Sequence, residues 1–405
     1  MVDVSDPNKQ ENTGLRLEAK EIKKDAERLI GISDPEDFVL GNLDRLIIAL
    51  KTESQLDELG LRKAREALVR AMTQRLDGLK WIREHPEITD EPIDSPIFLM
   101  GLPRSGTTYL QYLFDLDDRF RQIRTWEALT PSPPPGADPS SAQSRRLAWL
   151  ERKKQLIPQV DGFESLHLHD EDGSEECHPL LEQSFGAAGL NNLYRIPSYF
   201  EYLLDEADIE LSYRVHKRQL QLLQWCQTRR PWVLKYPNHL LAVPEILRVY
   251  PDARFVMTHR DPLQVLASIC KLSWKLRSAR SAHRIDQLDI GRYMTRFIER
   301  HVDRIIDTAN GPFAHRIAHV DYYALVRDPA SELFKVHEAL GIASPKSVRE
   351  AVSAWHAANP KGARGENRYG FEEYGLDERS LEKRFRDYTV QFNIPRERAG
   401  LAQND

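Results

Sequence analysis

The chain has 405 residues, which suits one large α/β domain with appended helices or about two or three smaller domains. Its 57 lysines and arginines and 62 aspartates and glutamates give a net charge of −5 with no long block of one sign, which argues against a nucleic-acid-coating protein. The three cysteines are isolated, and no apolar run reaches the roughly 18 to 20 residues of a membrane helix, so we expect a cytoplasmic protein.

The N-terminal part is polar and then helical. We expect a disordered tail over residues 1–14 and a helical region over residues 15–90, where apolar residues recur every three or four positions. About three amphipathic helices fit this stretch. Their apolar faces pack either against the rest of the chain or against a second subunit, so a homo-oligomer is compatible with the pattern.

A phosphate-binding pattern opens the remaining unit, which we place at residues 91–395. It reads PIFLMGLPRSGTTYLQY from Pro96 to Tyr112, a short buried strand followed by a glycine-bounded loop and a helix. Such a loop directs backbone N–H groups and the positive end of the helix dipole at one anion. The loop and first helical turn contribute Arg104, Ser105, Gly106, Thr107 and Thr108 to this cradle.

The cation of the cradle distinguishes two kinds of enzyme. A P-loop NTPase has the form G-x-x-x-x-G-K-[ST], but Thr107 stands in its lysine position and the loop carries Arg104 instead. This difference argues against ATP or GTP hydrolysis. The form PRSGTT resembles the 5′-phosphosulfate loop of the sulfotransferases that use 3′-phosphoadenosine 5′-phosphosulfate (PAPS). A generic phosphate-binding turn is the alternative.

The segment after the cradle helix is too long for a simple crossover. On the order of 115 residues precede the next strand, whereas a parallel crossover needs about a dozen. We predict a helical cap over residues 137–230, including a helix over 175–185, and expect it to form the acceptor pocket. Its aromatic residues permit a hydrophobic or aromatic alcohol as the small-molecule acceptor but are equally ordinary core residues: Phe163, Phe185, Tyr194, Tyr199, Phe200 and Tyr202.

Candidate bases lie inside this cap, in LHLHDEDGSEECHPLL. An acceptor hydroxyl needs a base within hydrogen-bond reach, and the family resemblance places that base here. We order the candidates Glu176, then His169, then His167, with Glu175 also open. Both glutamates would equally suit the first turn of a helix. Two histidines without a clear third ligand do not indicate a metal site.

Further strands are predicted at residues 232–235, 254–258 and 316–320, alternating with helices. This order predicts an α/β fold, a P-loop-like parallel sheet flanked by helices, with the helical N-terminal region and the helical insertion. Ligands bind at the carboxyl ends of such strands. Lys235 and the sequence His259-Arg260-Asp261-Pro262 stand at two of these ends and would supply cations to one rim.

The strand-to-helix turn at Arg260 carries the second part of the resemblance. Asp261 suits a helix N-cap and Pro262 a first helical position, so Arg260 ends the strand and Ser268 lies two turns into the helix. This Arg and Ser resemble the sulfotransferase element that holds the cofactor's 3′-phosphate. The alternatives are a salt bridge from Arg260 to Asp261 or Glu245, and a packing role for Ser268.

The third part is a basic loop near the C-terminus, Lys361-Gly362-Ala363-Arg364-Gly365. It resembles the phosphate-contacting loop of the bacterial-type sulfotransferases, with Arg364 as the best match and Lys361 second. A solvated loop is the alternative. The resemblance covers about residues 28 to 385 and implies a PAPS-dependent sulfotransferase without a metal.

In that mechanism Arg104 and Lys235 would stabilise charge on the sulfuryl group and on the departing phosphate oxygen. Two other functions remain open from the sequence. A nucleotide-dependent kinase on a similar core would require Mg²⁺, and a non-catalytic nucleotide-binding protein would turn over no acceptor.

Overall fold

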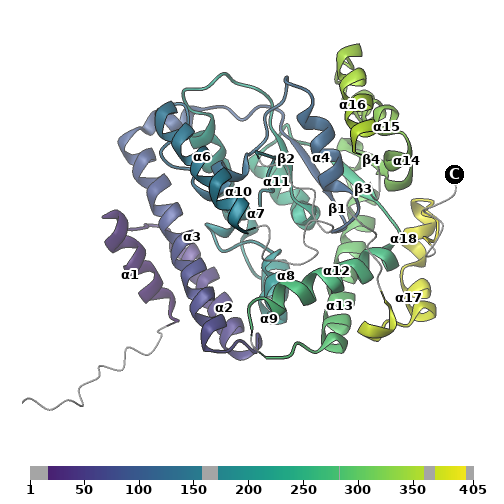
Figure 1. The fold of residues 1–405 in the computed structure, drawn as a ribbon, viewed down its shortest axis with the longest axis horizontal. Coiled ribbons are helices and arrows are strands. Elements are labelled where there is room, and N and C mark those ends of the chain that lie inside the picture. Colours follow the sequence, from purple (N-terminus) through teal and green to yellow (C-terminus); the bar gives the residue numbers. More distant parts are fainter. Residues whose placement is uncertain (1–16, 157–171, 282, 360–369, 398–405) are drawn as a thin grey trace, which may run out of the picture.

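A four-stranded parallel sheet lies at the centre of the computed structural model, which describes residues 17–156, 172–281, 283–359 and 370–397 (Figure 1). The strands are β1 (Ile97–Gly101), β2 (Val233–Lys235), β3 (Arg254–His259) and β4 (Ile317–Asp321), in the order β2-β1-β3-β4. Helices cover the sheet on both sides. The predicted fold class is confirmed.

The register of the strands brings their carboxyl ends to one edge. Leu99 pairs with Lys235, Gly101 with Thr258, and Thr258 with Val320. The segments that follow β1, β2 and β3 therefore all leave the sheet at the edge where parallel sheets bind ligands.

Alternating residues of the strands divide the core into two layers, because successive side chains of a strand point to opposite faces. Ile97, Leu99 and Val256 pack in one layer, and Phe98 and Phe255 pack in the other. Helices of the first layer are α4 (Thr107–Asp115), α14 (Tyr322–Arg327), α15 (Pro329–Ala339) and α16 (Lys346–Ala358); those of the second include η3 (Pro237–Ala242), α11 (Val243–Val249), α12 (Pro262–Ser278) and α13 (Gln287–Asn310).

The N-terminal helices pack against the cap. They are α1 (Ala19–Ile30), α2 (Asp37–Thr52) and α3 (Glu58–Glu84), followed by the short η1 (Pro86–Asp90), and their apolar residues belong to the same core as one face of the sheet. Asn42 of α2 donates to the backbone oxygen of Ser184 at 3.0 Å. Packing within the chain thus accounts for these faces. The tail predicted over residues 1–14 lies outside the described residues.

The predicted insertion between α4 and β2 is helical. It contains α5 (Thr125–Leu129), α6 (Pro139–Leu156), α7 (His178–Glu182), α8 (Leu190–Leu193), α9 (Pro197–Asp205) and α10 (Ile209–Gln224). The expected helix over 175–185 is shorter than predicted. Glu175 and Glu176 precede it, in a segment hydrogen-bonded to distant backbone: the N–H of Glu175 donates to the backbone oxygen of Ile123 at 2.8 Å, and that of Cys177 donates to the backbone oxygen of Lys235 at 2.9 Å. The alternative that these glutamates lie in the first turn of a helix was wrong.

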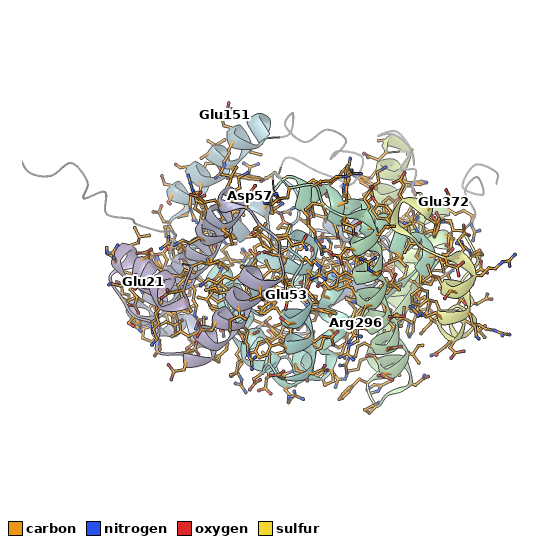
Figure 2. The ribbon with its side chains drawn as sticks, turned by 90° about the horizontal axis from the view of Figure 1, so that it is seen from below. Glu21, Glu53, Asp57, Glu151, Arg296 and Glu372 are labelled. Atoms are coloured by element: carbon orange, nitrogen blue, oxygen red, sulfur yellow. The ribbon has the colours of Figure 1, made fainter. Side chains whose placement is uncertain are left out.

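Short elements complete the C-terminal part, namely η4 (Ala314–Arg316), η5 (Glu372–Tyr374), α17 (Glu378–Arg384) and α18 (Arg386–Gln391). Figure 2 shows the side chains of the described residues from below, among them the charged Glu21 of α1, Glu151 of α6 and Arg296 of α13. Within the described ranges, no helix combines the length and apolar character needed to cross a bilayer.

Candidate active site

The loop after β1 has the conformation of an anion cradle. Arg104 has a φ of +69° and Gly106 one of +94°, so two of its residues lie in the left-handed region. A side chain at Gly106 would meet the Tyr322 ring, since a Cβ there would lie 2.8 Å from that ring's Cδ2. A non-glycine residue held at positive φ, such as Arg104, is typical of functional sites.

Ser105 fastens the cradle to the neighbouring strand. Its buried Oγ donates to the backbone oxygen of Leu102 or shares a hydrogen bond with Thr258 Oγ1, each at 2.6 Å. The Ser105 hydroxyl thus makes its hydrogen bonds within the protein, to the loop itself and to β3. Thr107 and Thr108 form the first turn of α4, with Thr107 buried and Thr108 half-buried, so the helix N-terminus faces the cradle.

Arg104, Ser268 and Arg260 come together beside the cradle. Arg104 Nε donates to Ser268 Oγ at 3.1 Å, and Arg260 Nη1 donates to the backbone oxygen of Arg104 at 2.9 Å. Asp261 caps α12 by accepting from the Leu263 N–H at 3.0 Å, as predicted. The strand-to-helix turn therefore places its arginine and serine against the loop after β1.

Arg260 is paired with a carboxylate that the sequence did not indicate. Its Nε and Nη2 donate to the two oxygens of Glu397 at 3.0 and 2.9 Å, and its guanidinium stacks 4.2 Å from the centre of the Tyr322 ring. Burial opposes the charge, but Tyr322 and Glu397 outweigh it and raise the pKa of Arg260. The salt-bridge partners considered above, Asp261 and Glu245, pair with Arg396 and Arg248 instead.

The carboxyl end of β2 brings a lysine and a candidate base into contact. Lys235 is 2% exposed, and its Nζ donates to the Glu176 carboxylate. The neighbouring Glu175 accepts the Glu176 N–H at 2.9 Å through its own carboxylate, and burial raises the pKa of Glu175. Of these two glutamates, Glu176 is the one that pairs with the cation at the sheet edge.

Tyr236 connects this strand end with the cap. Its hydroxyl accepts the Gly189 N–H at 2.6 Å and lies 3.3 Å from His178 Nδ1, while the opposite ring nitrogen of His178 lies 3.1 Å from Glu182. No alanine would fit at position 189, because a Cβ there would come within 2.9 Å of both His178 and Tyr236. The Tyr236 hydroxyl thus helps to fix the cap above Lys235.

Several predicted site residues lie outside the described part of the chain. These are the alternative bases His167 and His169 and the C-terminal loop residues Lys361, Arg364 and Gly365. In the part that is described, no group of three or more His, Cys, Asp or Glu side chains could hold a metal ion.

Sequence reasoning missed Glu397, Tyr322 and Tyr236 as members of the site. Glu397 and Arg260 are 137 positions apart, and no local pattern marks such a pair. Tyr322 and Tyr323 directly follow the end of β4, the fourth strand of the same edge, and that position was a usable signal.

The sheet, the cradle without a lysine and the basic strand ends define an α/β protein whose sheet edge suits a bound anion. Residues 96–346 match the family model described as the Sulfotransferase family, and the chain belongs to that family.

Curated relatives and solved structures agree with this assignment. The chain is 27% identical over 255 residues to the omega-hydroxy-beta-dihydromenaquinone-9 sulfotransferase Stf3 of Mycobacterium bovis and of Mycobacterium tuberculosis, a match over 62% of this chain and 63% of those relatives. Sulfotransferase STF9 from Mycobacterium avium is similar with a TM-score of 0.87 at 27% identity, over 95% of this chain and 99% of that one. Sulfotransferase STF1 from Mycobacterium tuberculosis H37Rv is similar with a TM-score of 0.79 at 27% identity, over 91% of this chain and 99% of that one.

Proposed function

We propose that this protein is a PAPS-dependent sulfotransferase that acts on a hydroxyl or amine of a small molecule. The observation that carries the proposal is the meeting of Arg104, Ser268 and Arg260 at the carboxyl edge of the sheet, joined by hydrogen bonds of 3.1 and 2.9 Å. These residues suit a nucleotide with anionic groups at both ends. Family membership favours this function over the kinase alternative.

The cradle fits the phosphosulfate end of PAPS. Left-handed backbone at Arg104 and Gly106 and the N-terminus of α4 favour a bound anion. The resemblance to the sulfotransferase element assigns Arg260 and Ser268 to the 3′-phosphate. Their chemistry suits this role, since a guanidinium pairs two oxygens at once and a hydroxyl can donate one further hydrogen bond. PAPS would supply a sulfuryl group bonded to a good phosphate leaving group.

The side chains then divide the chemical task. The acceptor oxygen forms a bond to sulfur while the bond from sulfur to the phosphate oxygen breaks, and the electron pair leaves with the nucleotide. Arg104 stabilises the charge that develops at the transferring group, and Lys235 does so from the neighbouring strand end. Glu176, whose carboxylate is paired with Lys235, takes the acceptor proton.

The acceptor is the second substrate of the proposed reaction. The named relatives act on a menaquinone derivative, according to their name, and we infer a hydrophobic alcohol for this chain as well. Buried aromatic side chains of the cap, including Tyr199 and Phe200, are compatible with such a molecule, although both belong to the core. We further propose a cytoplasmic enzyme.

A transfer assay in EDTA tests the proposal. The protein is incubated with PAPS and a panel of phenols and long-chain alcohols, and release of 3′-phosphoadenosine 5′-phosphate (PAP) is measured beside ATP with Mg²⁺. We expect acceptor-dependent PAP release without metal, and a loss of about 10²- to 10⁴-fold in Glu176→Gln, the range for a positioned base. Phosphoryl transfer from ATP would support the kinase alternative. Tight PAP binding without turnover of any acceptor would support the non-catalytic one.

A further inference from the structure

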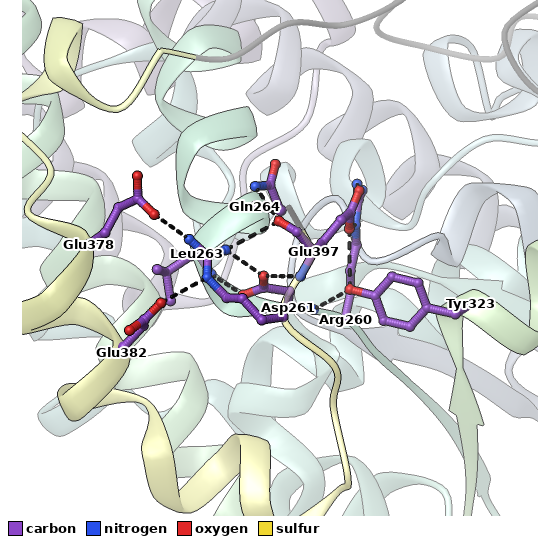
Figure 3. A network of polar contacts seen from close by, with 9 residues as sticks. Arg260, Asp261, Leu263, Gln264, Tyr323, Glu378, Glu382 and Glu397 are labelled. Atoms are coloured by element: carbon purple, nitrogen blue, oxygen red, sulfur yellow. Dashed lines mark hydrogen bonds and ion pairs between the residues drawn. The ribbon is translucent and has the colours of Figure 1, made fainter. Parts of the chain in front are cut away.

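The two-nitrogen edge of the Arg260 guanidinium, Nε and Nη2, which we call the fork, is already bound to a carboxylate. Both oxygens of Glu397 accept from Arg260, at 3.0 and 2.9 Å, and Tyr323 donates its hydroxyl to the same carboxylate at 3.2 Å (Figure 3). The two paired side chains are only 12% and 16% exposed. A bidentate arginine pair of this kind has the geometry with which arginine also binds a phosphate.

The backbone around Glu397 is held by contacts that do not involve its carboxylate. Its N–H donates to Asp261 Oδ2 at 2.8 Å, and its carbonyl oxygen accepts from Gln264 at 3.0 Å (Figure 3). The preceding Arg396 binds Asp261 and two carboxylates of α17, those of Glu378 and Glu382. The segment Ile394–Glu397 is therefore anchored at the turn before α12 even when the Glu397 side chain rotates away.

A phosphate and this carboxylate compete for the same donors. Glu397 uses Nε and Nη2 of Arg260, while Nη1 is directed to the Arg104 carbonyl oxygen. A phosphate that takes the two-nitrogen fork must displace the carboxylate, and like charges around one guanidinium repel each other when both are present. The side chain of Glu397 thus lowers the affinity of the fork for any second anion.

We propose that Glu397 is an internal ligand of the 3′-phosphate site, whose carboxylate leaves the Arg260 fork when a 3′-phosphorylated nucleotide binds. This inference rests on the assignment of Arg260 to the 3′-phosphate. Nucleotides without a 3′-phosphate have no group for the fork and leave the ion pair in place. Glu397 therefore sets how strongly the protein retains its nucleotide product, PAP.

Calorimetric titration of the full chain with PAP and with AMP tests the proposal. In Glu397→Gln, which keeps the shape of the side chain but removes its charge, we expect PAP to bind about tenfold more tightly and AMP to bind unchanged. Glu397→Asp keeps the charge on a shorter side chain, and we expect a smaller increase in PAP affinity for this variant. The control is Glu382→Gln, which removes a carboxylate from Arg396 and leaves the Arg260 pair intact.

The same titrations separate this inference from the proposed function. If Arg260→Ala leaves PAP binding unchanged, the 3′-phosphate assignment itself is wrong. If Arg260→Ala weakens PAP binding but Glu397→Gln binds PAP no more tightly than wild type, Arg260 binds the phosphate and Glu397 does not compete with it. Tighter PAP binding in Glu397→Gln but not in Glu382→Gln supports the inference.

Discussion

Arg104 Nε donates a hydrogen bond to Ser268 Oγ at 3.1 Å, across 164 positions of sequence. This contact joins the residue assigned to the sulfuryl group with a residue assigned to the 3′-phosphate. A serine hydroxyl that accepts from Arg104 still has its own proton to donate to a phosphate. The two ends of the proposed nucleotide site are therefore connected through one side chain.

Ser268→Ala should weaken the binding of PAP. It removes one hydrogen bond to a charged group and one support of Arg104, so we expect a loss of about 1.5 kcal/mol, or roughly tenfold in Kd, by calorimetry. Ser273→Ala is the matched control, because Ser273 is buried on the same helix and contacts Asn192 and Met294 instead. Equal losses in both variants would show that Ser268 acts through packing alone.

Arg104→Ala should reduce turnover more than binding. Loss of one preorganised donor at the developing charge costs about 3 to 4 kcal/mol, which corresponds to roughly 10²- to 10³-fold in kcat. The measurement is PAP release at saturating PAPS with an acceptor found in the assay above. Arg280→Ala is a suitable control, since Arg280 follows the end of α12 that is opposite to Arg260 and donates to the backbone oxygen of Leu276 at 2.9 Å. An unchanged kcat would remove Arg104 from the chemistry.

Gly106→Ala should destabilise the protein more than Gly31→Ala. Both glycines have positive φ, +94° and +84°, but a Cβ at Gly31 meets nothing within 4 Å, whereas one at Gly106 lies 2.8 Å from the Tyr322 ring. We expect about 1 kcal/mol from the backbone alone and about 2 to 3 kcal/mol when the ring must move. Urea unfolding of both variants measures the difference. Equal losses of unfolding free energy in the two variants would mean that the Tyr322 ring moves aside without destabilising the protein.

The His178–Glu182 pair should make stability depend on pH. Burial opposes the charge on each group, but the partner outweighs it, so the pKa of His178 is raised above 6.5 and that of Glu182 is lowered below 4.5. The raised histidine stabilises the fold fully below its ordinary pKa and loses this effect as the pH rises through its folded value. The lowered glutamate stabilises the fold above its ordinary pKa and loses this effect as the pH falls through its folded value.

Both contributions are complete between about pH 4.5 and 6.5. Replacing Glu182 by Gln should therefore lower the unfolding free energy by about 1.5 kcal/mol near pH 5.5 and by less near pH 9, because the effect of the raised histidine is lost as the pH rises through its folded pKa. Denaturant titrations of wild type and variant at the two pH values provide the comparison. A constant difference would show that the pair is not ionised in the folded protein.

The sequence predicted local features well because they depend on local chemistry. The cradle is encoded by Gly101 and Gly106, and the turn after β3 by Asp261 and Pro262, within a few residues in each case. Parallel pairing of the strands then followed from their alternation with helices. The sequence ranked Glu176 ahead of Glu175 as a candidate base, and Glu176 is the one whose carboxylate accepts a hydrogen bond from Lys235.

Distant pairs could not be predicted in the same way. The alternative considered for Arg260 was a salt bridge to its sequence neighbour Asp261 or to Glu245 of α11, but the carboxylate that pairs with Arg260 comes from Glu397 near the C-terminus. The expected helix start at Glu175 was wrong because the N–H groups of Glu175 and Cys177 donate to the backbone oxygens of Ile123 and Lys235 instead of lying in a helical turn. Both outcomes depend on tertiary contacts that no local pattern records.

The most direct measurement is calorimetric titration of the full chain with PAP in EDTA, with wild type and Arg260→Ala side by side and ADP with Mg²⁺ as the comparison. Tight metal-free binding of PAP, weak binding of ADP, and a loss of PAP affinity but not of AMP affinity in Arg260→Ala are the results that the PAPS site at the sheet edge predicts. Tight binding of ADP with Mg²⁺ and weak binding of PAP would contradict it.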